Sequence, residues 1–212
     1  MNKLFIIGLP RTGTTSISAV LLDYGFKVAH TAYTKRAFEL AHAISDAPCF
    51  SDYKELDLIF PGSKFVYLDR PLESWLPSVQ RLLKKMHPQL TPKTGYLNTV
   101  LKRSFEQTFS LSKSLQPYSE QHLSACYKRH QKEVFAYFSG RDDFLNIDIH
   151  YPDSLNRLRE FLGISDDSLT GFPHLNIGKE VDAWKNLKHP NKINANIAGK
   201  EHRQFFSYVK EL

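Results

Sequence analysis

Hydrophobic residues recur along the chain with two different spacings, which predict strands separated by helices. A short, continuous apolar run is typical of a buried parallel strand and occurs at residues 4–7, and further strands are predicted at residues 26–30, 64–69 and 144–149. Apolar residues at helical spacing predict helices at residues 17–24, 34–44, 52–60, 119–138 and 154–162, a further helix that begins at Pro71, and an aromatic helix around residues 205–208. Strands that alternate with helices indicate an α/β fold of three layers, with a mostly parallel central sheet flanked by helices.

The hydrophobic pattern weakens and becomes polar between Lys84 and Pro117. We predict that residues 84–117 form a loop and a helix inserted over one side of a single domain, which spans residues 1–212. Inserted surface elements of this kind often carry substrate-binding residues. A length of 212 residues is sufficient for one such domain with a substantial core.

The charge balance limits the classes of ligand. The chain has 28 Lys and Arg residues against 22 Asp and Glu residues, a net charge of +6. This charge favours anionic ligands but is too small to indicate nucleic acid. The apolar run at residues 4–9 is too short for a signal peptide or a membrane span, and Cys49 and Cys126 are expected to be reduced thiols. We therefore expect a cytoplasmic protein without nucleic-acid or membrane partners, whose oligomeric state the sequence leaves open.

A glycine-containing loop joins the first predicted strand to the next helix, with the sequence Gly-Leu-Pro-Arg-Thr-Gly-Thr-Thr at residues 8–15. This arrangement directs backbone N–H groups and a helix N-terminus at one anion. Gly8 and Gly13 have the spacing of a P-loop and predict a P-loop NTPase-like fold, but Thr14 stands where a nucleoside triphosphatase has Lys. Arg11 is the available replacement cation. Such a loop suits a nucleotide with one 5′-phosphate joined to a less charged leaving partner.

Residues 10–15 of this loop resemble the 5′-phosphosulfate-binding loop of sulfotransferases that use 3′-phosphoadenosine 5′-phosphosulfate (PAPS). The usual form of that loop is Pro-Lys-Ser-Gly-Thr-Thr. This chain departs from that form at Arg11, where cytosolic members have Lys and the bacterial and carbohydrate-type branches have Arg. The resemblance implies that Arg11 contacts the bridging oxygen and stabilises the leaving phosphate, which an Arg can do only electrostatically. The residues that it implies for binding the 5′-phosphosulfate are Pro10, Arg11, Thr12, Gly13, Thr14 and Thr15.

A second resemblance to the same family follows the strand at residues 64–69. Sulfotransferases carry an Arg eight residues before a Ser at this point, and both hold the 3′-phosphate of the nucleotide; here they are Arg70 and Ser78. A guanidinium group suits a phosphate dianion, and a hydroxyl adds one more donor. A basic, Gly-containing stretch closes over the nucleotide in many relatives, and Lys179 is a loose match to it.

The general base remains open between two residues. Cytosolic sulfotransferases use His in a His-x-Pro element about two dozen residues before the 3′-phosphate Arg. Here Asp46-Ala47-Pro48 lies 24 residues before Arg70, so the resemblance implies that Asp46 is the base. His30 is the competitor, because it follows the second strand at the edge where parallel sheets bind ligands and has a suitable intrinsic pKa. Asp52 ranks third and is interpreted as the N-cap of the next helix.

These features predict a sulfotransferase that moves a sulfuryl group from PAPS to a hydroxyl or amine of a small-molecule or carbohydrate acceptor, releasing 3′,5′-ADP. No metal is required, because PAPS carries less charge than ATP. Two alternatives remain. A P-loop kinase would use Asp69, at the end of the strand at residues 64–69, to hold Mg²⁺ for transfer from ATP. A non-catalytic nucleotide-binding protein would have kept the fold and lost the acceptor site.

Overall fold

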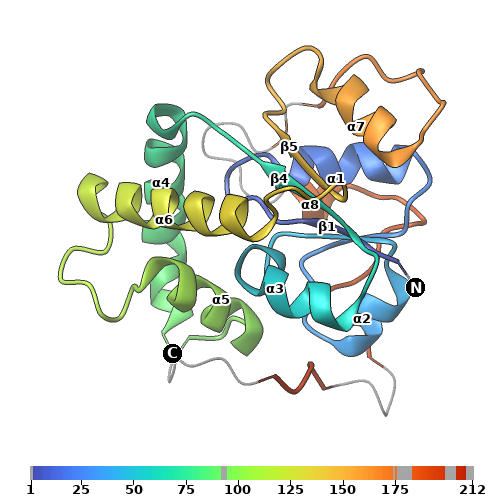
Figure 1. Ribbon diagram of the computed structural model, residues 1–212. Coiled ribbons are helices and arrows are strands. Elements are labelled where there is room, and N and C mark those ends of the chain that lie inside the picture. The colour runs from blue at the N-terminus through green and yellow to red at the C-terminus, as the bar shows by residue number, and fades with distance from the viewer. Residues whose placement is uncertain (1, 92–94, 174, 176–182, 199–203, 209–212) are drawn as a thin grey trace.

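The computed structural model describes residues 2–91, 95–173, 175, 183–198 and 204–208. Among these residues, five parallel strands form one sheet in the order β2-β3-β1-β4-β5 (Figure 1). The strands are β1 (Leu4–Ile6), β2 (Val28–His30), β3 (Ala43–Ser45), β4 (Lys64–Leu68) and β5 (Phe144–Ile147). Because all of them are parallel, their carboxyl ends lie at one edge of the sheet. The chain adds β2 and β3 on one side of β1 and then β4 and β5 on the other, which makes the end of β1 the topological switch point.

Helices cover both faces of this sheet, which confirms the predicted α/β fold. The helices of the described residues are α1 (Thr14–Asp23), α2 (Lys35–Leu40), α3 (Cys49–Ile59), α4 (Leu72–Leu90), α5 (Thr99–Phe109), α6 (Glu120–Tyr137), α7 (Ser154–Leu162) and α8 (Ala183–Asn186). Successive strand residues point to opposite faces. Leu4 and Ile6 therefore pack against α1 and α7, whereas Phe5 packs against α2, α3 and α6.

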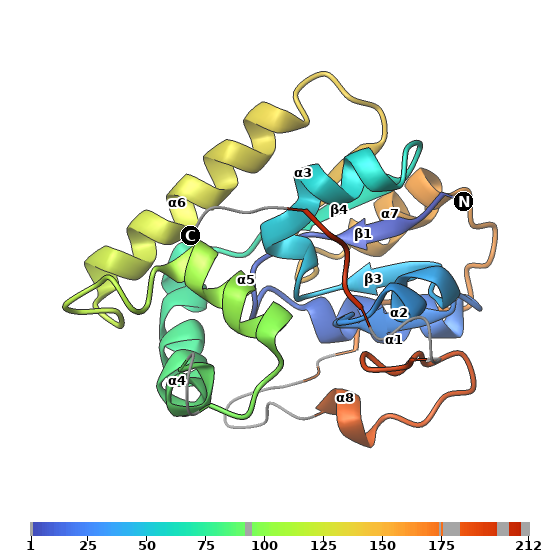
Figure 2. The same ribbon diagram turned by 90° about the horizontal axis from the view of Figure 1, so that it is seen from below.

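A third group of helices lies beyond the carboxyl edge of the sheet. There α4 and α5 pack together against α6 around Trp75, Phe105 and Leu123, and this cluster also contains Leu9 of the glycine-containing loop (Figure 2). Residues 84–117, the predicted insertion, comprise the last turns of α4 and the whole of α5 in the part that is described. None of the helices in the described ranges is both long and apolar enough to cross a membrane.

The prediction of one helix over residues 34–44 was wrong. Helix α2 ends at Leu40, and Ala43–Ser45 forms β3, which pairs with β2 on one side and β1 on the other. All three residues of β3 are fully buried. Hydrogen bonding to two neighbouring strands outweighs the local preference of this short segment for helix.

The predicted aromatic helix near the C-terminus was also wrong in its described part. Residues 204–208 contain no helix; they cross α2, where the rings of Phe205 and Phe206 pack against Phe38 (Figure 2). The preceding segment runs beside the edge strand β2, where the Val28 N–H donates to the Asn191 carbonyl at 2.9 Å. The C-terminal region thus covers an edge and a face that would otherwise be open.

Candidate active site

The loop at residues 8–15 connects β1 to α1 at the carboxyl edge of the sheet. Its turn is closed by Thr12, whose Oγ1 donates to the Leu9 carbonyl at 2.7 Å. Gly8 is required sterically, because a Cβ would lie 2.6 Å from Leu68 Cβ, and Gly13 is favoured by its left-handed backbone, with a φ of 108°. The N-cap residue of α1 is Gly13, which has no side chain to cap the helix. The first N–H groups of α1 therefore face the loop, as in helix N-termini that bind anions.

Two arginines and a serine that are far apart in the sequence meet at this loop. The Arg11 Nε donates to Ser78 Oγ at 2.8 Å, and Arg70 Nη1 donates to the Arg11 carbonyl at 2.6 Å. Burial and the nearby charge of Arg70 lower the pKa of Arg11. The fold thus gathers three of the predicted site residues, Arg11, Arg70 and Ser78, and places two like charges together. An anion between the two guanidinium groups would relieve their repulsion.

Trp75 of α4 holds the loop through a hydrogen bond. Its indole Nε1 donates to the Pro10 carbonyl at 2.9 Å, and the ring is fully buried. Since Trp75 lies in the first turn of α4, between Arg70 and Ser78 in the sequence, this contact fixes α4 relative to the loop. The predicted loop residues and the predicted Arg–Ser pair are therefore held together by direct hydrogen bonds and by packing.

The two candidates for the base are neighbours. His30 ends β2 and Asp46 follows β3, and these strands are adjacent, so His30 Nε2 lies 3.7 Å from Asp46 Oδ2. Thr14 of the loop donates its hydroxyl to the same carboxylate oxygen at 3.4 Å. Asp46 therefore lies beside the N-terminus of α1, whereas β3, which positions it, was missed in the sequence.

The backbone at this edge is strained. Among the described residues four non-glycine residues have a positive φ, and three of them follow β1, β2 and β3: Arg11 at 72°, Thr31 at 78° and Asp46 at 59°. Left-handed backbone is unfavourable for residues that carry a Cβ and persists where the surrounding structure enforces it. Such strain clusters at functional sites.

A chain of hydrogen bonds fixes the tautomer of His30. Ser18 donates its hydroxyl to the Thr14 carbonyl at 2.7 Å, so it accepts from Ser45 at 2.8 Å. Because the hydroxyl of Ser45 donates its hydrogen bond to Ser18, its oxygen accepts from His30 Nδ1 at 2.7 Å. Burial lowers the pKa of His30 and favours the neutral ring. Its Nε2 therefore carries the lone pair and accepts from the Thr15 hydroxyl, 3.2 Å away.

Asp69 is held by α6. Its Oδ1 accepts from the Tyr127 hydroxyl at 2.6 Å and from the Gln131 side chain at 3.2 Å. The Arg70 N–H donates to the same oxygen at 2.9 Å. These contacts direct the carboxylate toward α6, which argues against the role of magnesium ligand that the kinase alternative gives to Asp69.

Two further predictions concern residues outside this cluster. Asp52 lies at a kink in α3, where its own backbone is non-helical (φ −113°, ψ 16°), so it stands at the start of a helical segment as predicted. Its side chain has no exposed surface, and its carboxylate binds both terminal nitrogens of Arg103 at 2.9 and 2.6 Å, a partner that was not predicted. Lys179 lies outside the described residues.

Several residues at the site were missed in the sequence. Ser45 was assigned to no element, and the ring of Trp184, 5.3 Å from that of His30, comes from a region without a clear pattern. Asp148 follows β5, and its charge raises the pKa of Arg70 while burial lowers it more. Arg81 lies three residues after Ser78, and this spacing places both residues on one face of a helix. The sequence therefore contains a signal for Arg81.

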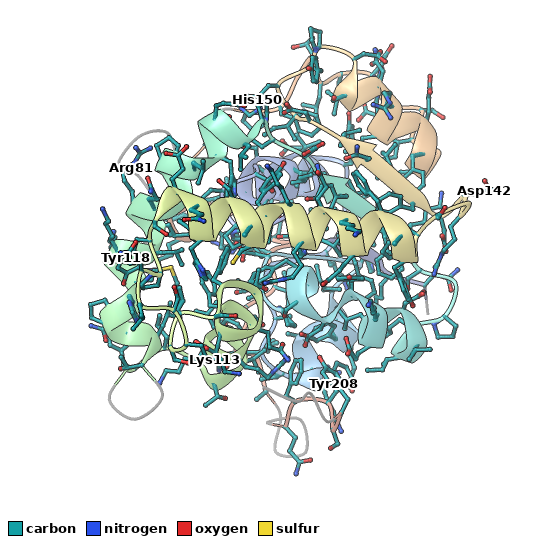
Figure 3. The ribbon with its side chains drawn as sticks, turned by 60° about the vertical axis from the view of Figure 1, so that its left-hand side comes forward. Arg81, Lys113, Tyr118, Asp142, His150 and Tyr208 are labelled. Carbon is teal, nitrogen blue, oxygen red and sulfur yellow. The ribbon has the colours of Figure 1, made fainter. Side chains whose placement is uncertain are left out.

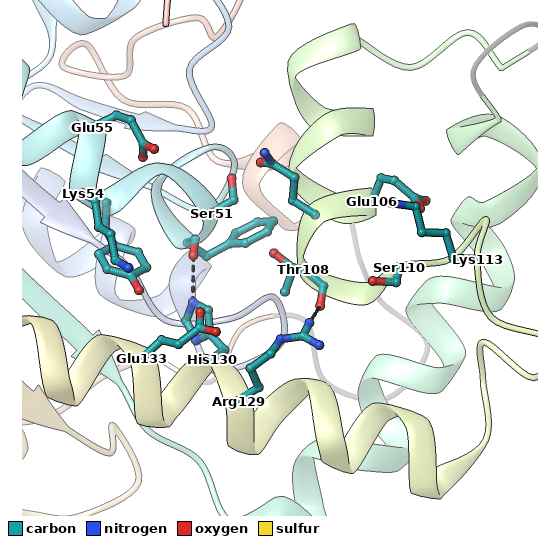
Figure 4. Close-up of a pocket in the computed structure, with 13 residues that line it drawn as sticks. Ser51, Lys54, Glu55, Glu106, Thr108, Ser110, Lys113, Arg129, His130 and Glu133 are labelled. Carbon is teal, nitrogen blue, oxygen red and sulfur yellow. Dashed lines mark hydrogen bonds between the residues drawn. The ribbon is translucent and has the colours of Figure 1, made fainter. Parts of the chain in front are cut away.

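A separate cavity of about 540 Å³ lies between α3, α5 and α6 (Figure 4). Arg129 and His130 on its wall already donate to the carbonyls of Thr108 and Phe50, both at 2.7 Å. None of the predicted site residues lines it; the lining residues are Phe50, Ser51, Tyr53, Lys54, Glu55, Glu106, Gln107, Thr108, Ser110, Lys113, Arg129, His130 and Glu133.

Comparison with known families identifies the class of protein. A family model described as a sulfotransferase domain matches residues 31–181, which is more than half of the chain. The protein therefore belongs to the sulfotransferase family and is a transferase. The match contains Asp46, Arg70 and Ser78 and begins after the loop at residues 8–15. A search of curated proteins gave no match.

Proposed function

We propose that this sulfotransferase takes its sulfuryl group from PAPS and transfers it to a hydroxyl or amine of a small-molecule or carbohydrate acceptor, releasing 3′,5′-ADP. The observation that carries the proposal is the direct contact of Arg11 with Ser78 and of Arg70 with the Arg11 carbonyl. A donor with phosphate at both its 3′ and 5′ positions needs two anion sites close together. The loop supplies one, and Arg70 with Ser78 supplies the other.

The chemistry of these side chains fits the two ends of PAPS. The N-terminus of α1 and loop residues 10–15 would hold the 5′-phosphosulfate. Ser78 accepts a bond from Arg11 and can still donate its own hydroxyl proton to a 3′-phosphate oxygen. Arg11, which reaches from the loop to Ser78, lies between the two sites, where it can neutralise negative charge that develops on the leaving 5′-phosphate.

Asp46 is the base in this proposal. As the acceptor oxygen or nitrogen forms its bond to sulfur, the bond from sulfur to the bridging oxygen of the donor breaks, and Asp46 takes the acceptor proton. His30 is not the base, because the Nε2 lone pair of His30 is engaged by the hydroxyl of Thr15. The two buried free thiols, Cys49 and Cys126, agree with a reducing compartment, and we propose that the reaction takes place in the cytoplasm.

Nucleotide binding tests the identity of the donor. We expect 3′,5′-ADP at 100 times its dissociation constant to stabilise the protein by about 2.7 kcal/mol, which raises the melting temperature by roughly 5–10 °C for a chain of this size. ATP with Mg²⁺ at the same concentration should have a smaller effect, as measured by a thermal-shift titration. A larger shift with ATP and Mg²⁺ would favour a kinase. Binding of labelled PAPS without sulfation of any acceptor in a broad hydroxyl and amine panel would favour the non-catalytic alternative.

Replacing Arg11 by Ala tests transition-state stabilisation. We expect kcat to fall by about 10²-fold, the typical loss of one preorganised donor, with a smaller change in the affinity for 3′,5′-ADP. A left-handed φ of 72° is as unfavourable for Ala as for Arg, so the substitution leaves the backbone strain unchanged. Steady-state rates with saturating PAPS measure the effect. Arg159→Ala is the matched control, because Arg159 lies in the last turn of α7 and contacts Asn156. An Arg11→Ala enzyme with the wild-type kcat would remove Arg11 from this role.

A further inference from the structure

One face of α4 lies against both guanidinium groups of the site. Ser78 Oγ accepts from Arg11 at 2.8 Å, and Ser74 Oγ, one turn earlier, accepts from Arg70 at 3.1 Å. Residues three and four positions apart are neighbours on a helix surface. Arg81, three residues after Ser78, therefore continues this face by one turn (Figure 3, which labels Arg81 on α4).

Arg81 is an exposed positive charge close to two others. It has no hydrogen bond or ion pair with any residue in the described ranges, and its side chain reaches solvent. Its charge lowers the pKa of both Arg11 and Arg70, each of which is also lowered by burial. The carboxylates of Asp46 and Asp148 offset part of this effect, at Arg11 and Arg70 respectively. Three guanidinium groups that repel one another in the free protein form a site in which a multivalent anion is stabilised.

We infer that Arg81 is a third cation of the donor site, which contacts the 3′-phosphate of the nucleotide together with Arg70 and Ser78. This inference rests on the proposed function. The 3′-phosphate is the favoured partner because Ser78 lies one turn before Arg81 on the same helix, whereas the 5′-group belongs to the loop. Arg81 would thereby help to distinguish a nucleotide with a 3′-phosphate from one without it.

The test compares two nucleotides that differ only in the 3′-phosphate. Dissociation constants for 3′,5′-ADP and AMP are measured by calorimetry with the wild type, Arg81→Ala, Arg81→Lys and the control Arg159→Ala. We expect Arg81→Ala to bind 3′,5′-ADP about 10- to 100-fold more weakly, as for the loss of one charge-assisted hydrogen bond, with AMP binding unchanged. Arg81→Lys should lose less, because it keeps the charge, and Arg159→Ala should bind both nucleotides like the wild type.

The outcomes separate this inference from the proposed function. If the wild type prefers 3′,5′-ADP to AMP and Arg81→Ala keeps the full preference, the assignment of Arg81 is wrong while the donor remains PAPS. Equal weakening of both nucleotides in Arg81→Ala would also overturn it, since a contact to the 3′-phosphate cannot affect AMP. A wild type without preference for 3′,5′-ADP would overturn both proposals.

Discussion

Replacing Asp46 by Asn is expected to lower kcat for sulfuryl transfer by about 10²- to 10⁴-fold, the range typical of a lost general base. Asn, whose amide nitrogen replaces the oxygen that accepts from Thr14 at 3.4 Å, keeps the shape of the side chain and one oxygen that can accept from the Ala47 N–H, as Asp46 Oδ1 does at 2.8 Å. It cannot take a proton. The affinity for 3′,5′-ADP should therefore remain that of the wild type while turnover is lost. Steady-state kinetics and calorimetry on the same preparation measure both.

His30→Gln is the matched control for Asp46→Asn. Because Nε2 of His30 accepts from Thr15, His30 is expected to act through position, and its replacement by Gln should cost less than the loss of Asp46. A loss as large as that of Asp46→Asn would make His30 the base. The pH profile adds a second readout. Burial lowers the pKa of His30, so the ring is neutral near pH 7. It becomes protonated only when the pH falls below 6.5, which is about the usual pKa of a histidine side chain. Protonated His30 donates to Asp46, so the acid limb of the profile should shift in His30→Gln.

The parts of the fold that the sequence predicts well are those with a strong local pattern. The runs at residues 4–7 and 65–68 are continuous and hydrophobic, because β1 and β4 have strands on both sides and helices on both faces. Strand β3 is just as central and as short as β1, but Ile44 also continues the helical spacing of Phe38 and Ala41. A pattern so short cannot distinguish strand from helix, since the pairing that decides between them comes from distant residues.

The residues of the candidate site also divide into those with a local sequence signal and those without one. The loop and the Arg–Ser pair can be identified in the sequence, because one contiguous motif or one fixed spacing carries each of them. The arrangement of His30 beside Asp46 depends on β2 and β3 being neighbours, which no local pattern encodes. The partner of Asp52 could not be predicted for the same reason, because Arg103 lies in α5, 51 residues away.

Replacing Asp52 by Ala is expected to lower the free energy of unfolding by about 3–5 kcal/mol, the typical cost of breaking a buried ion pair by removing one partner. Asp52 is fully buried, and it joins α3 to Arg103 of α5 and to the hydroxyl of Tyr208 in the C-terminal segment. Burial alone would lower the pKa of Arg103, but the hydrogen bonds with Asp52 raise it. Without Asp52, the charge of Arg103 would remain partly buried and uncompensated. Urea unfolding at pH 7 measures the change.

Two comparisons make the Asp52 result specific. The double variant Asp52→Ala/Arg103→Met removes both charges and should be more stable than Asp52→Ala alone, because no buried charge is left without a partner. Glu39→Ala, in an exposed pair with Arg36 at 3.1 Å, should cost at most about 1 kcal/mol. A loss in Asp52→Ala no larger than that of Glu39→Ala would show that Asp52 contributes no more than an exposed surface pair, and that packing alone holds α5 and the C-terminal segment against α3.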